Sequence, residues 1–159
     1  MRKRKMKKTP LRLENEGKLT LFFVGVGSAF SKRHYQTNLL VVKGTDHLMI
    51  DCGTKTPQAI HELGLSITDI DTFFITHSHA DHVGGLEEVM LTNRYMARKK
   101  PRIILPRPYH SLLWNNSLKG GSGCNESEGD RIKRLRMEDM WSVVRPSRAR
   151  EYTRDTYHA

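Results

Sequence analysis

The sequence has no long apolar run, only two cysteines and few acidic residues for its size. No stretch approaches the ~20 consecutive apolar residues that a membrane-spanning helix needs. The basic N-terminus is not followed by the apolar segment of a secretory signal. Two cysteines, Cys52 and Cys124, do not make a disulfide framework. We therefore expect a protein of the reducing cytoplasm with no membrane partner.

Positive charge is abundant, with 27 Lys and Arg against 17 Asp and Glu and a formal net charge of +10. Much of it lies in the first eight residues, and two further basic groups lie within residues 98–107 and 131–150. Such groups attract phosphate-bearing partners, but they also occur on ordinary solvated faces. We expect residues 1–17 to be a disordered basic tail and residues 18–159 to form one domain. For the other two groups both interpretations stay open.

The pattern of apolar residues predicts alternating strands and helices, and hence an α/β layer. Thr56 is expected to cap a helix that stops at Gly64, and Met96 to lie on the apolar face of the helix after Gly85. The Gly-rich stretch "GGSGCNESEG" is predicted to be a flexible loop, and "MEDMWSVV" is ambiguous. Strands are expected at residues 19–24, 39–42, 48–50, 71–77, 102–106 and 150–159, and helices at 56–64, 86–99 and 108–121.

Four residues able to hold a metal follow one of the predicted strands, in the stretch "FFITHSHADHVGG". His77 and His79 are two positions apart, so on an extended segment they point the same way and can converge on one metal. The tightening loop then brings Asp81 and His82 to a second metal. Imidazole and carboxylate together suit Zn²⁺, and also Mn²⁺. A chance grouping of surface histidines would not explain the position between an apolar strand and Gly-Gly, so the pattern predicts a metal site with two ions.

The same stretch resembles the T-H-x-H-x-D-H-x-G-G pattern of hydrolases with the metallo-β-lactamase fold, an αββα sandwich. The opening "FVGVGSAFSKRHYQTNLLV" is similar to the ribonuclease Z-like branch. The segments "GSAF", "DCGTKTPQAIHELG" and "LLWNNSLKGG" resemble the anti-Pycsar cyclic-nucleotide phosphodiesterases, from about residue 18 to residue 121. The chain would then hold mainly the N-terminal αβ half of the sandwich.

This resemblance implies two zinc ions, the first on His77 and His79 and the second on Asp81 and His82. It also implies that Asp51 orients a ligand histidine, although a turn-forming Asp is the simpler alternative. Asp81 would in addition accept a proton from the attacking water. The implied reaction is hydrolysis of 3′,5′-cyclic nucleotides such as cyclic CMP and cyclic UMP to 5′-monophosphates, which counters cyclic-nucleotide defence signalling. The resemblance further implies a homodimer.

The family's site needs further ligands that follow in the second half of its fold. His158 ends a strand-like segment and is the candidate for the third ligand of the first metal, with an incidental histidine as the alternative. His34 is a candidate for substrate contact. We expect either a chain that is truncated relative to the family or a compact variant that completes its site in another way.

Two other functions stay open. The first is a ribonuclease Z-like endonuclease that trims tRNA 3′ ends, which the basic groups and the shared opening favour. No inserted arm suited to gripping tRNA is evident, so nucleic acid is the less expected partner. The second is a catalytically incomplete nucleotide-binding remnant, which the missing downstream ligands favour.

Overall fold

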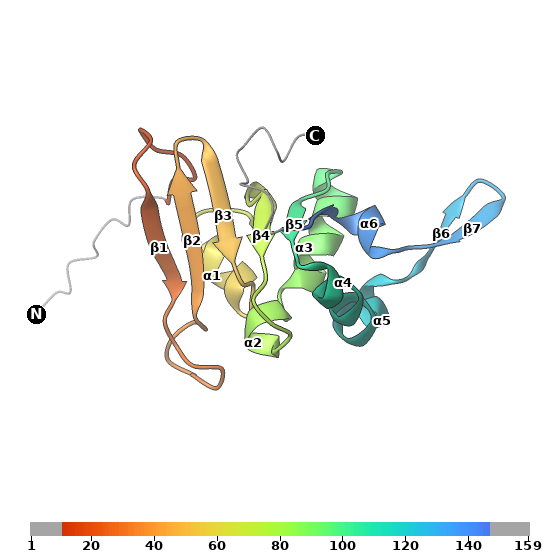
Figure 1. Cartoon of the computed structure of the whole chain (residues 1–159), viewed down its shortest axis with the longest axis horizontal. Coiled ribbons are helices and arrows are strands. Elements are labelled where there is room, and N and C mark those ends of the chain that lie inside the picture. The colour runs from red at the N-terminus through yellow and green to blue at the C-terminus, as the bar shows by residue number, and fades with distance from the viewer. Residues whose placement is uncertain (1–10, 147–159) are drawn as a thin grey trace, which may run out of the picture.

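A computed structural model describes residues 11–146 (Figure 1). Eight strands and six α-helices are found in this range. The strands are β1 (Thr20–Gly25), β2 (Asn38–Lys43), β3 (Asp46–Ile50), β4 (Thr72–Phe74), β5 (Arg102–Ile104), β6 (Asn125–Glu128), β7 (Arg131–Arg134) and β8 (Ser142–Val144). The helices are α1 (Thr56–Glu62), α2 (Ala80–Val83), α3 (Leu86–Thr92), α4 (Arg107–Leu113), α5 (Lys119–Ser122) and α6 (Met137–Met140). A 3₁₀ turn, η1 (Ile67–Asp69), and two π-helical turns, η2 (Asn93–Ala97) and η3 (Trp114–Leu118), complete the list.

Six strands form one mixed sheet in the order β1-β2-β3-β4-β5-β8. The first three are antiparallel, whereas β3, β4, β5 and β8 run parallel. The predicted hairpin is confirmed, and Gly44 in its turn has the positive φ of 61° that favours glycine. The carboxyl ends of parallel strands meet at one edge, and this edge carries the candidate site.

One face of the sheet packs against α1 and α3 and contains the core. Inward side chains of four neighbouring strands are fully buried there, together with apolar residues of both helices. The strand residues are Leu40, Met49, Phe73 and Ile103, and the helix residues are Ala59, Ile60, Leu86, Val89 and Met90. Alternation of buried and exposed positions along the strands produces this one-sided core.

The other face carries a row of apolar side chains whose exposure is greatest at the β1 edge of the sheet and falls to 9% at Ile104. The strand register aligns one residue from each of the six strands in this row, from Phe23 on β1 to Val144 on β8. Phe23 remains 58% exposed and Leu21 remains 54% exposed. The described residues thus form one αβ layer, as the sequence predicts, and the second face of its sheet is exposed at the β1 edge.

Four details differ from the sequence-based expectations. Thr56 is the first residue of α1 and Lys55 precedes it, so Thr56 is not the cap, and its buried hydroxyl has no partner among the described residues. Met96 is 79% exposed because the π-helical turn η2 adds a residue to the turn and rotates the following side chains off the apolar face. Part of the expected Gly-rich loop is strand β6, which pairs with β7 around a tight turn at Gly129.

The fourth difference concerns the N-terminal segment, expected to be disordered up to residue 17. Leu11 and Leu13 are half-buried and pack against the core. Asn15 bonds to Gly44 twice, because its backbone N–H donates to the Gly44 carbonyl at 2.8 Å and its Oδ1 accepts from the Gly44 N–H at 2.9 Å. Residues 11–17 are therefore tied to the sheet. The rest of the expected tail and the strand expected at 150–159 lie outside the described residues. In residues 11–146 no helix is long and apolar enough to cross a membrane.

Candidate metal centre

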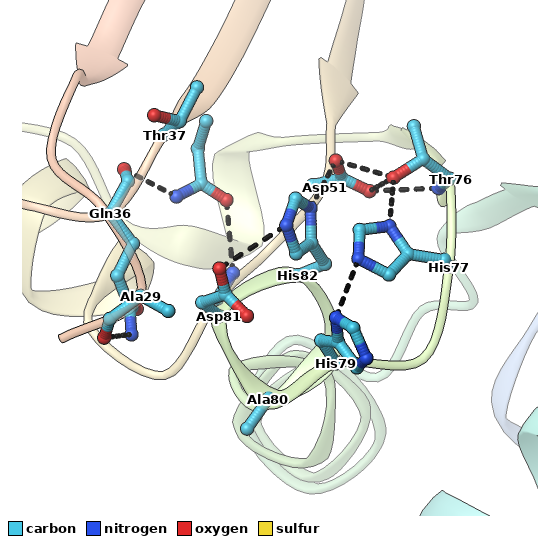
Figure 2. A network of polar contacts seen from close by, with 12 residues as sticks. Ala29, Gln36, Thr37, Asp51, Thr76, His77, His79, Ala80, Asp81 and His82 are labelled. Atoms are coloured by element: carbon cyan, nitrogen blue, oxygen red, sulfur yellow. Dashed lines mark hydrogen bonds and ion pairs between the residues drawn. The ribbon is translucent and has the colours of Figure 1, made fainter.

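The clustered residues lie on the loop that leaves β4 and on the short helix α2 that follows it, next to the end of β3. Because β3 and β4 are parallel neighbours, Asp51 just after β3 faces the stretch from Thr76 to His82. Figure 2 shows the side chains of His77, His79, Asp81 and His82 on one side of this loop, with Asp51 behind the histidines. The four predicted ligand residues and Asp51 are thus brought together.

Asp51 is the centre of a buried hydrogen-bond network. It is 5% exposed, and its φ of 63° is unusual for a residue other than glycine, although Asp adopts this region more readily than most. Its carboxylate accepts hydrogen bonds from the Thr76 backbone N–H at 2.8 Å and from the Thr76 hydroxyl at 2.8 Å. It also lies 2.7 Å from Nδ1 of His82. The left-handed conformation and the contact with a histidine therefore occur together, and the role of His82 as a metal ligand stays a prediction.

These contacts fix which ring nitrogen carries the proton in two histidines. A carboxylate only accepts, so Nδ1 of His82 donates to Asp51 and Nε2 is left without a proton in the neutral ring. The single hydroxyl proton of Thr76 is used on Asp51, so Thr76 Oγ1 accepts from Nδ1 of His77 at 3.0 Å. Nε2 of His77 is then also unprotonated. Asp51 thus holds two imidazoles, one directly and one through Thr76, in the tautomer whose Nε2 carries no proton.

Each unprotonated Nε2 lies beside a second atom that could bind a metal. Nε2 of His77 accepts a hydrogen bond from Nδ1 of His79 at 3.0 Å, through a proton that a bound metal would replace, and Nε2 of His82 lies 3.3 Å from Oδ2 of Asp81. Two ligand atoms on one tetrahedral zinc are roughly 3.3 Å apart, given bonds of about 2.0–2.1 Å. The spacing and chemistry of both pairs therefore fit Zn²⁺ or Mn²⁺.

The pairs alone do not complete a metal site. Among residues 11–146 no group of three or more His, Cys, Asp or Glu side chains is arranged to hold one ion. Two donors for each of two metals is the arrangement that the sequence predicts for this part of the chain. His158, the expected third ligand of the first metal, lies outside the described residues, and its role stays a prediction.

The loop is held in place by the segment that follows Asp51. Backbone bonds join Cys52 N–H to the His82 carbonyl at 2.8 Å and Gly85 N–H to the Cys52 carbonyl at 2.9 Å. A Cβ added at Gly53 would lie 2.1 Å from the Asp81 carbonyl oxygen, so only glycine fits this close approach. Burial raises the pKa of the Cys52 thiol, which argues against a role as a nucleophile.

Sequence reasoning missed three polar residues that support this arrangement. Thr76 appears in the sequence only as the first residue of the T-H-x-H-x-D-H pattern, and its hydrogen bonds with Asp51 and His77 become visible only in the fold. Asn38 is 2% exposed, and its Oδ1 accepts from the Gly53 N–H at 3.0 Å. Tyr109 accepts a hydrogen bond from Ser78, which stands between the two histidines, at 2.9 Å. Burial and the charge of Asp51 raise the pKa of Tyr109, although the bond from Ser78 opposes this.

His34 lies on the β1–β2 loop and is exposed. It lines a hollow of about 560 Å³ together with Lys32, Arg33, Tyr35, Lys55, Gln58 and Glu62. No contact between His34 and the four ligand candidates is found in residues 11–146, so its proposed contact with substrate stays a prediction.

Comparisons with known proteins agree with these observations. A sequence model of the family described as "Anti-Pycsar protein Apyc1" matches residues 19–158. The Anti-Pycsar protein Apyc1 of Bacillus phage vB_BsuM-Goe3 is 41% identical over 128 residues, covering 79% of this chain and 47% of the relative. That of Paenibacillus xerothermodurans is 44% identical over 111 residues, covering 70% and 44%. The chain thus spans slightly less than half the length of these curated relatives.

Solved structures show the fold. A diphosphatase from the PhnP family superposes with a TM-score of 0.58 at 17% identity, covering 82% of this chain and 51% of that one. The metallo-β-lactamase fold protein YhfI from Bacillus subtilis has a TM-score of 0.53 at 14% identity, covering 69% of this chain and 48% of that one. Human tRNase Z, short form, superposes with a TM-score of 0.50 at 25% identity, covering 59% of this chain and 36% of that one. The expected metallo-β-lactamase fold is confirmed.

Proposed function

Because this chain belongs to the Anti-Pycsar protein Apyc1 family, we propose that it is a metal-dependent phosphodiesterase that hydrolyses 3′,5′-cyclic nucleotides. Cyclic CMP and cyclic UMP are the proposed substrates, nucleoside 5′-monophosphates the products, and removal of a cyclic-nucleotide defence signal the biological effect. A homodimer is part of this proposal and rests on the resemblance.

The observation that carries the proposal is the network around Asp51. It leaves Nε2 of His77 and of His82 unprotonated, each beside a second donor. Histidines that only stabilise the fold do not require two imidazoles to be held in the same tautomer. A pair of such positions on one loop is the arrangement that a phosphodiesterase with two metals requires.

The proposed ligands are His77 and His79 for one ion and Asp81 and His82 for the other. When bound, the metals lower the pKa of a coordinated water and neutralise negative charge that develops on the phosphate. Asp51 holds the rings of His77 and His82 in the required tautomers. Asp81, beside His82, is also in position to accept the proton that the attacking water loses.

The water oxygen forms a bond to phosphorus, the bond between phosphorus and the 3′ oxygen breaks, and that oxygen leaves with a proton. The product is a nucleoside 5′-monophosphate, with no oxidant or second substrate required.

A tRNA 3′-processing endonuclease is the second candidate. Its support is the structural likeness to human tRNase Z, short form, at 25% identity and a TM-score of 0.50. The groove along β7 also has several basic residues, including Arg131, Arg134 and Arg136, and basic grooves attract RNA backbones. A nucleotide-binding protein without catalysis is the third, because residues 11–146 supply only two donors for each metal.

One panel of assays separates the three. Protein loaded with zinc or manganese is incubated with cyclic CMP, cyclic UMP and precursor tRNA, with Asp81→Ala as the control. Turnover of cyclic nucleotide that disappears in Asp81→Ala supports the phosphodiesterase. Cleavage of tRNA alone supports the endonuclease. Binding of cyclic nucleotide without turnover of either substrate supports the non-catalytic protein and refutes our proposal.

A further inference from the structure

The loop between β1 and β2, residues 26–37, carries an unusually exposed aromatic side chain. Phe30 is 86% exposed, the highest value among the large apolar residues of the described range. Val26 in the same loop is 68% exposed. A phenylalanine this exposed adds little to folding, because burial of its ring is the source of its stabilising effect. Its location on the molecule therefore matters more than its exposure alone.

This loop is fastened beside the candidate metal centre. Gln36 is 6% exposed, its Nε2 donates to the carbonyl of Ala29 at 3.3 Å, and its Oε1 accepts from the Lys55 N–H at 3.3 Å. The same Oε1 lies 2.7 Å from the position of a Cβ on Gly53, the glycine that touches Asp81. Figure 2 shows Ala29 and Gln36 next to Asp81. Phe30, bonded to Ala29, thus follows directly after an anchored point at the edge of the site.

The rest of the loop is held and charged in a way that suits an anionic ligand. The ammonium group of Lys55 donates to the Ser31 carbonyl at 2.9 Å, which fixes the chain on the other side of Phe30. Lys32 and Arg33 follow and line the hollow of about 560 Å³. A cyclic nucleotide has one negative phosphate and one flat base. Its phosphate would occupy the site on the β4 loop, which leaves the base to find an apolar face nearby.

We propose that Phe30 is the residue on which the nucleobase of the substrate stacks. The inference rests on the proposed function and adds the means of base recognition. An aromatic ring offers a π-face that all bases fit, without hydrogen bonds to their edges. The arrangement therefore favours both pyrimidine and purine cyclic nucleotides, with only modest differences between them. The two flanking anchors, Gln36 and Lys55, hold the loop, so that little conformational freedom is lost on binding.

The test measures affinity separately from turnover. The slowly hydrolysed phosphorothioate analogue of cyclic CMP is titrated by calorimetry into metal-loaded wild type, Phe30→Ala and Phe30→Trp. Loss of one stacked base costs about tenfold in affinity. We therefore expect Phe30→Ala to bind about tenfold more weakly and Phe30→Trp to bind at least as tightly as wild type. Ile132→Ala, which alters a 77%-exposed residue on the β6–β7 hairpin, is the matched control and should leave the affinity unchanged.

A second ligand distinguishes stacking from a change in loop shape. The 3′,5′-cyclic phosphate of 1-deoxyribose has the phosphate and sugar but no base. Wild type and Phe30→Ala should bind it equally. An equal loss for both ligands in Phe30→Ala, or no loss for either, would overturn the proposal. Absence of any binding by wild type would overturn it as well. Binding that depends on Phe30 without turnover of cyclic CMP would support stacking and refute the proposed enzyme activity.

Discussion

Replacement of Asp51 by Asn tests whether this residue sets the tautomer of His82 or only shapes a turn. Asn adopts the left-handed conformation about as readily as Asp, so the φ of 63° adds little cost. Its amide oxygen can keep the two bonds from Thr76 that Oδ1 now accepts, at 2.8 and 3.0 Å. Its amide nitrogen then replaces Oδ2 and faces Nδ1 of His82.

The expected loss of stability is modest. A bond to a charged group contributes about 1.5–3 kcal/mol, and the neutral bond from the Asn amide to His82 restores about 0.5–1.5 kcal/mol. Asp51→Asn should therefore lower the free energy of unfolding by about 1–2 kcal/mol. Asp51→Ala strands the donors of Thr76 and His82 in a buried site and should cost about 3–5 kcal/mol.

The effect on metal binding should be larger. In Asp51→Asn the amide donates to Nδ1 of His82, so the ring proton moves to Nε2 and blocks the proposed ligand atom. Changes in such supporting residues weaken metal affinity by about 10- to 100-fold. Urea unfolding measures the loss of stability, and competition with a zinc chelator measures the loss of metal affinity. Asp130→Asn, at the exposed tip of the β6–β7 hairpin, is the matched control. Wild-type zinc affinity in a less stable Asp51→Asn would refute our account of Asp51.

Three further predictions concern the same loop and the hairpin. Thr76→Val should weaken zinc about tenfold in chelator competition, because the link that fixes the His77 tautomer is lost. Gly53→Ala should lower the free energy of unfolding by about 3 kcal/mol or more in urea, since its Cβ would collide with the Asp81 backbone. A hydrogen bond from Arg94 lowers the pKa of Glu126 from 4.5 to about 2. Glu126 therefore stabilises the fold above pH 4.5 by about 1–2 kcal/mol, and this contribution should vanish as the pH falls towards 2.

The controls are matched to each change. Thr76→Ser keeps the hydroxyl and should bind zinc like wild type. Gly120→Ala places its Cβ in open space and should leave the urea midpoint nearly unchanged. For Glu126, the difference in stability between wild type and Glu126→Gln is followed with pH. A difference that stays constant from pH 6 to pH 3 would contradict the proposed ion pair between Arg94 and Glu126. Equal zinc affinity in Thr76→Val and Thr76→Ser would contradict the proposed role of Thr76 in fixing the tautomer of His77.

Local patterns were sufficient to predict much of the fold. The alternation in "NLLVVKGTDHLMI" predicts the β2–β3 hairpin, because apolar runs flank a turn that contains glycine. The four ligand candidates were found because they are close in sequence and follow a strand. Asp51 was identified through the resemblance to the metallo-β-lactamase-fold hydrolases.

Features that depend on distant contacts were not predictable in the same way. The π-helical turn η2 puts Arg94 and Tyr95 in contact with Glu126, and these contacts hold β6 against η2. The sequence "GGSGCNESEG" contains no sign of that partner, so its polar and Gly-rich composition predicted a loop. The hydrogen bonds of Gln36 and Asn38 were not predictable either, because they depend on Gly53 and Lys55 being adjacent in the fold.

The most direct test of the central claim is the identity of the product formed in ¹⁸O-labelled water. Metal-loaded protein and its Asp81→Ala variant are incubated with cyclic CMP, and the products are followed by ³¹P NMR and mass spectrometry. We predict that wild type forms 5′-CMP with one ¹⁸O on its phosphate and that Asp81→Ala forms none. Formation of 3′-CMP, or no product from protein with metal bound, would contradict the account.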